Sequence, residues 1–475
     1  MLNAYIYKKE LRSKEGEKMQ EKAIVAISTP PGKGGIACVR ISGEKVFEIA
    51  EKVFNPAQKS KKISKMEGYT AVFGHFTHGT LKDECIALVY KAPKSYTGED
   101  VVEFFCHGGE AVAKELLIAC IETGAKPAEA GEFTKRAFLN GKMSLTQAEA
   151  VIDLIDATSR QGVLSASFAL EGALYNRIKE KSIIPLTEVA GHLAAYTDFP
   201  DEDVPELEEE TLKNTLQKAE KELQNLIKTF DTGAVMRRGI ETVIVGSPNV
   251  GKSTLLNLFS GYERAIVTNI PGTTRDVVEQ VVSIGGIELI LSDTAGIRKT
   301  DDEVEKAGIM RAYGKIEQVK FVISVFDGSL PVTAEDVDLA KLCESKAFSL
   351  AIINKADLKQ KFKQQEIEKY FKKVIVISAK EEGSLKQVEE SVLEVIGISE
   401  IDVDAGILAN TRQLSAAQEA WQAVVDASDA LQSGFTLDAV GVCIDDALAA
   451  LYELTGETVS ELVVEEIFSK FCVGK

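Results

Sequence analysis

The sequence lacks the features of a disulfide-stabilised, zinc-binding or membrane-spanning protein. Its seven cysteines, at positions 38, 85, 106, 120, 343, 443 and 472, form no C-x-x-C pair, and their number is odd. This pattern argues against a disulfide framework and a zinc site, so the thiols indicate a reducing compartment, the cytoplasm. No run of about 18 apolar residues is present, and we therefore expect no membrane span.

An excess of positive charge is also missing. The net charge at pH 7 is −18. The chain as a whole therefore lacks the excess of basic residues that is typical of a protein that binds nucleic acid over a broad surface. The acidity favours solubility, and nucleic acid would have to bind at a local patch or through a partner. Residues 1–18 lack the apolar run of a signal peptide. We expect them to form a disordered leader, with Met19 as a plausible start.

The remaining residues change character along the chain, and 475 residues suffice for about two to four domains. Residues 19–140 mix strand-like runs with a helical pattern and predict an α+β domain. Residues 141–235 are helical, apart from the acidic stretch 198–210. Residues 236–396 alternate apolar strands with helices, which is typical of a buried parallel sheet. Residues 397–475 are helical again, so we expect a multidomain chain with an α/β domain inserted into an all-α domain.

The strongest motif is GSPNVGKST, which follows the strand-like TVIV and precedes the helical STLLNLF. This is the G-x-x-x-x-G-K-S pattern of a P-loop in its required context. Its glycines let backbone N–H groups turn toward phosphate oxygens. Lys252 would reach the β- and γ-phosphates, and Ser253 would ligate Mg²⁺. The inserted domain is therefore predicted to be an α/β P-loop domain.

The base is indicated by NKAD, residues 354–357, after the strand SLAII. The carboxylate of Asp357 accepts two hydrogen bonds from the N1–H and 2-amino groups of guanine, whereas adenine offers neither donor. The SAK segment, 378–380, follows the next strand and would close over the base. Ligands bind at the carboxyl ends of such strands, so these motifs predict a guanine nucleotide rather than ATP.

Two further motifs complete the set. DTAG, 293–296, would hold Mg²⁺ through water at Asp293 and face the γ-phosphate with the N–H of Gly296. GTTRD, 272–276, supplies Thr274 as a second Mg²⁺ ligand. The motifs occur in the order found in the translation-factor-related class of GTPases, which the chain resembles.

Three residues bear on hydrolysis. Ile297 stands after DTAG, where Ras-like GTPases have a glutamine that orients water, so another residue must do this or hydrolysis is very slow. Arg275 could stabilise transition-state charge, although a salt bridge within its own segment is the alternative. The amide oxygen of Asn249 could ligate a monovalent cation together with carbonyls of 265–274, or Asn249 could simply brace the P-loop.

At this point the sequence resembles the tRNA modification GTPase MnmE (TrmE) family, from about residue 20 to the end. The resemblance is carried by the GTPase motifs and by four further segments: STPPGKGGIACVRISG, YTGEDVVEFFCHGG, GEFTKRAFLNGKMSLTQAEAVIDLIDA and the terminal FCVGK. It implies an N-terminal domain that dimerises and binds 5-formyltetrahydrofolate or a related one-carbon folate, a helical domain, and an inserted GTPase domain. In the homodimer, the GTPase domains would meet when GTP and K⁺ are bound.

The resemblance also implies partners and a reaction. The homodimer would form a heterotetramer with MnmG (GidA), which carries FAD. Together they would install an aminomethyl or carboxymethylaminomethyl group at C5 of the wobble uridine, position 34, of certain tRNAs. A regulatory or ribosome-assembly GTPase without modification activity is the alternative reading of the same nucleotide motifs.

Site residues follow from the resemblance position by position. The implied Mg²⁺ ligands are Ser253 and Thr274, and the implied K⁺ ligands are Asn249, Thr268, Ile270 and Thr273. The catalytic residues are Glu305, which would orient water in place of Ile297, and Cys472. The residues implied to bind folate are Arg40, Glu103, Lys142 and Lys475. The full set of implied GTP-binding residues is Asn249, Val250, Gly251, Lys252, Ser253, Thr254, Thr268, Asn269, Ile270, Pro271, Gly272, Thr273, Thr274, Asp293, Thr294, Ala295, Gly296, Asn354, Lys355, Ala356, Asp357, Ser378, Ala379 and Lys380.

The terminal FCVGK has two readings, a frayed end or a working thiol. The helical ELVVEEIFSKF runs into it, and we expect Gly474 to end that helix and free Cys472 to point into a cleft. The resemblance implies that Cys472 is needed for modification and not for GTP hydrolysis. Nucleophile, acid and partner contact all stay open as its role. His107 is expected to be structural, and TRQ after Asn410 departs from the family's usual Arg-His.

Overall fold

The structure is a computed structural model that describes residues 22–198, 208–260, 280–291, 316–381, 383–398 and 406–474, together with Gly314 and Asp404. The expected leader, 1–18, lies outside these ranges. The chain divides into two compact units, which are described one after the other. The first consists of Met1–Ile152, Thr187–Val204 and Ala430–Lys475, and the second of Asp153–Leu186 and Pro205–Asp429. The domain boundaries expected near residues 140, 235 and 396 stay a prediction.

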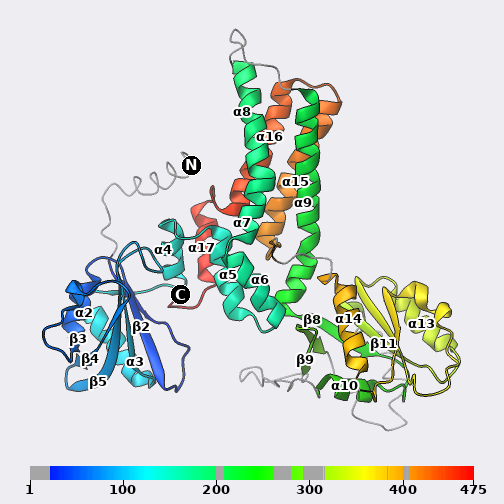
Figure 1. Ribbon diagram of the computed structural model, residues 1–475, viewed down its shortest axis with the longest axis horizontal. Coiled ribbons are helices and arrows are strands. Elements are labelled where there is room, and N and C mark those ends of the chain that lie inside the picture. Colours follow the sequence, from blue (N-terminus) through cyan, green and yellow to red (C-terminus); the bar gives the residue numbers. More distant parts are fainter. Residues whose placement is uncertain are drawn as a thin grey trace. The chain divides into compact units, whose positions relative to one another are not determined.

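The first unit contains a seven-stranded sheet in the order β3-β4-β5-β6-β2-β1-β7. All neighbouring strands are antiparallel except β1 and β7. Helices α2 (Val46–Val53) and α3 (Glu110–Glu122) pack on one face through a shared apolar core (Figure 1). The strand-like runs and the helical pattern expected within residues 19–140 are confirmed. The strands are β1 (Ile24–Ile27), β2 (Ile36–Ser42), β3 (Phe54–Pro56), β4 (Thr70–His78), β5 (Leu81–Tyr90), β6 (Val101–His107) and β7 (Lys126–Pro127).

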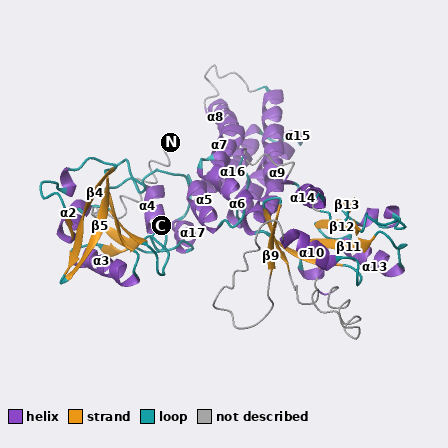
Figure 2. Cartoon of the chain, turned by 60° about the horizontal axis from the view of Figure 1, so that its bottom comes forward, coloured by secondary structure: helices purple, strands orange, loops and turns teal. Residues whose placement is uncertain are grey.

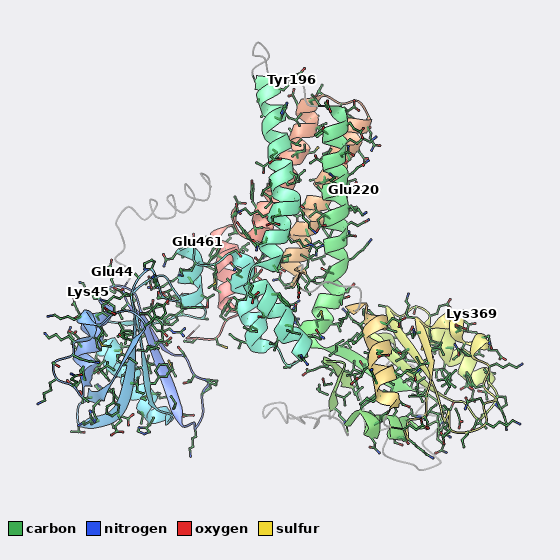
Figure 3. All side chains as sticks on the ribbon, viewed as in Figure 1. Glu44, Lys45, Tyr196, Glu220, Lys369 and Glu461 are labelled. Carbon is green, nitrogen blue, oxygen red and sulfur yellow. The ribbon has the colours of Figure 1, made fainter. Side chains whose placement is uncertain are left out.

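Outside the sheet and its two covering helices, the described first unit contains further helices. The short helix η1 (Ile63–Lys65) follows β3, and α4 (Glu132–Leu139) follows β7. Two helices, α5 (Leu145–Asp156) and α8 (Ile184–Asp198), belong to it in part. The C-terminal pair is α16 (Leu437–Thr455) and α17 (Glu461–Ser469), whose first residue is labelled in Figure 3.

The second unit contains a six-stranded sheet in the order β13-β12-β11-β8-β10-β9. One face carries α10 (Lys252–Ser260) and α14 (Ser384–Ile396), and a separate apolar core lies under α13 (Ala334–Cys343) (Figure 2). Strands alternate with helices here, as expected for residues 236–396, except at one hairpin. The strands are β8 (Ile240–Val245), β9 (Gln280–Ile284), β10 (Ile287–Leu291), β11 (Phe321–Asp327), β12 (Phe348–Asn354) and β13 (Lys373–Val376), with the short helices η3 (Gln364–Glu366) and η4 (Glu368–Tyr370) before β13.

One strand differs from the expectation. The apolar run 280–291, which reads as one strand in the alternation expected for residues 236–396, is a hairpin of β9 and β10 that turns at Gly285 and Gly286. Their φ angles are 60° and 79°. Two consecutive left-handed residues make the tight turn that joins antiparallel strands, and glycine adopts that conformation without strain. The sheet is therefore mixed, with β9 antiparallel on an otherwise parallel set.

The helical part of the second unit packs against this hairpin. The backbone N–H of Gln161 donates to Gly286 O at 3.3 Å, and Thr158 Oγ1 donates to Glu288 Oε2 at 2.7 Å. The hairpin thus contacts the start of α6. The described helices are α6 (Arg160–Leu170), α7 (Ala173–Ile178), the π-helical turn η2 (Lys179–Ile183), α9 (Glu209–Arg238) and α15 (Thr411–Gln432). Within the described ranges, no helix is both long and apolar enough to cross a membrane.

Candidate nucleotide and N-terminal sites

The P-loop connects the end of β8 to the start of α10 and is pressed against the neighbouring strands. Gly246 and Gly251 have φ angles of 146° and 104°. A Cβ on Gly246 would overlap Val325 O of β11, and one on Gly251 would overlap the amide nitrogen of Asn354 at the end of β12. Only glycine fits at either position, because both the backbone conformation and the space exclude a side chain.

Lys252 lies at the first helical position after this loop. Its ammonium donates to Gly246 O at 2.7 Å and to Ser247 O at 2.8 Å, and burial lowers the pKa of the amine below its ordinary value. Ser253 follows and is exposed. The N-terminus of α10 therefore offers unsatisfied N–H groups, a cation and a hydroxyl at one point, which is the chemistry that a polyphosphate with its metal requires.

Asn354 ties the predicted motifs together. Its Nδ2 donates to Val250 O in the P-loop at 2.8 Å, and its Oδ1 accepts from the N–H of Ala379 at 2.9 Å. Asp357 accepts from Ser378 Oγ at 2.9 Å. One buried amide thus joins the P-loop, the NKAD segment and the SAK segment, so the structure brings 249–254, 354–357 and 378–380 to one edge of the sheet.

The remaining predicted nucleotide and metal residues lie outside the described ranges. They are Thr268, Asn269, Ile270, Pro271, Gly272, Thr273, Thr274, Asp293, Thr294, Ala295, Gly296 and Glu305, and the same holds for Arg275, Ile297 and Lys475. Their roles stay predictions.

In the first unit, Arg40 of β2 and Glu103 of β6 are direct cross-strand partners. Arg40 Nε donates to Glu103 Oε1 at 2.7 Å, and the Tyr90 hydroxyl donates to Glu103 Oε2 at 3.2 Å. Burial, followed by the charge of Glu103, raises the pKa of Tyr90 to about 12. The guanidinium lies 5.5 Å from the ring centre of Tyr96 and 5.6 Å from that of Phe133. The cluster combines an ion pair with aromatic faces.

Sequence reasoning found the two charges of this cluster and missed its aromatic residues. Tyr96 stands in the segment KSYTGED, and Phe133 in GEFTKR, but no spacing rule connects either to Arg40. Lys142 joins the same region through the 91–100 loop, because its ammonium donates to Pro93 O at 3.1 Å. The structure therefore groups three of the four predicted folate residues around one loop.

The C-terminal segment does not follow the expectation. Helix α17 ends at Ser469, with Lys470 as its C-cap, so Gly474 is not what ends it. Gly474 instead has a φ of 101° and lies against the end of β1, where its carbonyl accepts from Ser28 Oγ at 3.1 Å. A Cβ there would approach Ile27 O to 2.5 Å. The glycine is needed for this close approach, and Cys472 is exposed.

The end of the chain and the Arg40 cluster share one short segment. Val473 forms a β-bridge with Ala130, and the N–H of Gly131 lies 3.5 Å from Cys472 O. Gly131 caps α4, whose Phe133 lies beside Arg40. The segment that carries the Cys472 thiol therefore contacts residues 130–131 in the same unit as the ion pair. The backbone of this segment is held in place and is not frayed.

Comparison with known proteins covers nearly the whole chain. A family model described as "GTP-binding protein TrmE N-terminus" matches residues 23–142, and one described as "MnmE helical domain" matches residues 145–472. The "tRNA modification GTPase MnmE" of Acetivibrio thermocellus is 40% identical over 96% of this chain and 100% of its own. The protein of that name from Alkaliphilus metalliredigens is 42% identical over 95% of this chain and 99% of its own.

Solved structures are similar to part of the chain. A single-residue variant of Era from Aquifex aeolicus is 23% identical and covers 39% of this chain and 66% of its own, with a TM-score of 0.25. The G domain of the Thermotoga maritima FeoB iron transporter is also 23% identical, covering 33% of this chain and 98% of its own, with a TM-score of 0.24.

Proposed function

Because the chain belongs to the tRNA modification GTPase MnmE family, we propose that it is a potassium-dependent GTPase that acts with an FAD-carrying MnmG partner on C5 of the wobble uridine of tRNA. The chain is a GTP hydrolase that takes part in tRNA modification. The observation that carries the finer proposal is the similarity over 96% of this chain and 100% of a curated relative, since it extends well beyond the GTPase motifs. The proposed compartment is the cytoplasm.

Asn249 and Ser253, the two described members of the expected donor set, lie at the carboxyl edge of the second sheet and carry oxygen atoms suited to K⁺ and Mg²⁺. Ser253 would hold Mg²⁺ together with Thr274 and the water-linked Asp293, because Mg²⁺ prefers oxygen ligands. Asn249 has a φ of 60° in the P-loop and would hold K⁺ with Thr268, Ile270 and Thr273. When bound, the two cations offset charge on the phosphate oxygens. Lys252 and the N-terminus of α10 bind and orient those oxygens.

Replacing K⁺ by Na⁺ tests the cation. We expect strong stimulation of GTP hydrolysis by K⁺ and little by Na⁺ at equal ionic strength, with GTP binding retained in both. Equal rates in the two salts would remove K⁺ from the proposal.

Glu305 is proposed to orient the attacking water. The variant Glu305→Ala should bind GTP with near-normal affinity and turn over about 100-fold more slowly, the usual scale for losing a general-base or water-orienting group. Glu303→Ala removes the acid two positions earlier in the same segment. It is the matched control and should hydrolyse GTP at the normal rate. A normal rate in Glu305→Ala contradicts the role.

The Arg40 cluster supports the proposal of a one-carbon folate site. A pterin offers amino and ring N–H donors to Glu103, and its flat ring can pack on Tyr96 or Phe133. Lys142, with Lys475, would meet the carboxylates of the glutamate tail. The described side chains of Glu103, Tyr96 and Lys142 would therefore suit the pterin ring and the acidic tail of a folate.

The open face of the first sheet supports the proposal of a homodimer. Phe73, Ile86, Phe105 and Cys38 are consecutive cross-strand partners across β4, β5, β6 and β2. Phe73 is 49% exposed and Ile86 is 45% exposed, whereas α2 and α3 pack on the opposite face of the sheet. An exposed apolar pair such as Phe73 and Ile86 is typical of a protein–protein contact, and a second copy could bury it. The heterotetramer with MnmG would build on that dimer.

The Cys472→Ser variant tests the modification itself. Mass spectrometry of wobble uridines should show loss of the C5 group, while purified protein hydrolyses GTP normally. Cys443→Ser, in α16, is the matched control and should leave both activities unchanged. Normally modified wobble uridines in cells carrying Cys472→Ser would favour the alternative, a regulatory or ribosome-assembly GTPase.

A further inference from the structure

Asp327 is a largely buried acid beside the nucleotide edge that the proposed site does not use. It is the last residue of β11 and the direct register partner of Asn354 on β12. Its side chain is only 10% exposed. A carboxylate in such a position is costly to bury unless it is paired, so its partners indicate its purpose.

Those partners lie in the base-recognition segment and in its own loop. Lys355, the lysine of NKAD, donates to Asp327 Oδ2 at 2.5 Å, and Ser329 donates to Oδ1 from its N–H at 2.9 Å and from Oγ at 2.6 Å. Burial alone would raise the pKa of Asp327. The hydrogen bonds from Lys355 and Ser329 outweigh it and hold the pKa below its ordinary value. The acid is therefore ionised and fully engaged at neutral pH.

The ion pair fixes an unfavourable backbone conformation. Lys355 has a φ of 66°, a left-handed conformation that is unfavourable for a residue with a side chain. Its carbonyl accepts from Gln360 Nε2 at 2.9 Å, and its side chain is held by Asp327. Two tethers thus stabilise the turn in which the chain leaves β12 and presents Asp357.

The loop after Asp327 holds the same turn through its backbone. Gly328 N–H donates to Asn354 O at 2.8 Å, and Gly328 O accepts from the N–H of Lys361 at 2.8 Å. A Cβ on Gly328 would overlap Gln360 Oε1 and approach Asn354 O to 2.8 Å. Residues 327–329 therefore contact the start of the NKAD segment at Asn354 and Lys355 and the chain beyond it at Lys361, and Asp327 supplies the charged contact.

We infer that Asp327 is a positioning residue for guanine recognition: by holding Lys355 in its left-handed turn, it aims the Asp357 carboxylate at the purine. This inference rests on the proposed guanine contact of Asp357. A carboxylate aimed in this way accepts from both N1–H and the 2-amino group. If the turn relaxes, Asp357 cannot accept both hydrogen bonds from guanine at once. Recognition of the 2-amino group then weakens more than binding of the phosphates does.

The test compares GTP with inosine triphosphate, which keeps N1–H and lacks the 2-amino group. In Asp327→Asn, binding of the full-length chain to GTP should weaken about tenfold, the scale of one charge-assisted hydrogen bond. Binding to inosine triphosphate should change much less, so the preference for GTP falls. The rate at saturating GTP should stay within about twofold, because the phosphate-binding residues are unchanged.

Asp336→Asn is the matched control. Asp336 is 9% exposed in the same unit and accepts in the capping box that begins α13 with Thr333. Its loss should lower the melting temperature and leave the nucleotide preference unchanged. Lys355→Met should reproduce the Asp327→Asn preference, and the double variant should lose little more, since the two residues act as a pair.

An unchanged preference in Asp327→Asn, or equal weakening for both nucleotides, overturns the inference. A wild-type chain that does not prefer GTP over ATP contradicts the guanine contact itself, which is a separate result. Melting curves of each variant show that the comparison is made between folded proteins.

Discussion

The two sheets of this protein bury their apolar residues to different extents. In the second unit, β11 and β12 are buried along nearly their whole length, because helices on both faces cover a mainly parallel sheet. In the first unit, β4 and β5 alternate buried and exposed residues, yet the exposed positions include Phe73 and Ile86. The first sheet leaves apolar surface for another molecule, whereas the second gathers polar residues at one edge, where a ligand can reach them.

The largest expected effect breaks the edge of the second sheet. Gly251→Ala forces a side chain into the Asn354 amide and separates the P-loop from the NKAD segment. GTP affinity should fall about 100-fold or more, from backbone strain together with a lost buried hydrogen bond. Fluorescent nucleotide titration measures this. Gly441→Ala, in α16 with open space around it, is the control and should bind GTP normally.

The next effect concerns the open face of the first sheet. Ile86→Lys places a charge in the exposed apolar pair of Phe73 and Ile86 and should weaken self-association about thirtyfold, the scale of an interface hot spot. Sedimentation velocity across a concentration series measures the change. Phe435→Lys, which alters a residue 64% exposed outside that sheet, should leave the association unchanged. A monomeric wild-type chain would contradict the dimer.

A smaller effect is expected at the Arg40 cluster. Arg40→Ala leaves the Glu103 carboxylate with the Tyr90 hydroxyl alone, so folate affinity should fall about tenfold and stability by about 2 kcal/mol. Calorimetric titration with 5-formyltetrahydrofolate measures the first. Arg177→Ala breaks the 2.6 Å pair with Glu222 in the second unit. It should reduce stability there without changing folate binding.

The smallest effect is a pH dependence at the end of β4. His78 donates to Glu115 at 2.7 Å and Glu122 at 3.0 Å, and these hydrogen bonds raise the pKa of the imidazole. A raised folded-state pKa stabilises the fold below the unfolded value of about 6.5 and loses that stabilisation as pH rises through the folded value. NMR titration should place the midpoint above the ordinary value of about 6.5, and Glu115→Gln should move it down. An unshifted midpoint contradicts the pairing.

The P-loop and the NKAD segment were predictable because each rests on local spacing beside an apolar strand. The β9–β10 turn was missed, since Gly285 and Gly286 interrupt a run whose apolar residues read continuously. The partners of Arg40 were only half predictable. Glu103 came from the family resemblance, whereas Phe133 reaches the cluster from a helix far along the chain. Asp327 carries no motif at all, and its role depends on a cross-strand register with Asn354 that spacing does not reveal.

A hydrogen bond from the Ser28 hydroxyl to the Gly474 carbonyl holds the last described residues at the end of β1. This contact bears on the choice of where to join a tag. An affinity tag or fluorescent fusion joined after Lys475 would begin two residues beyond that hydrogen bond, close to the segment that carries Cys472.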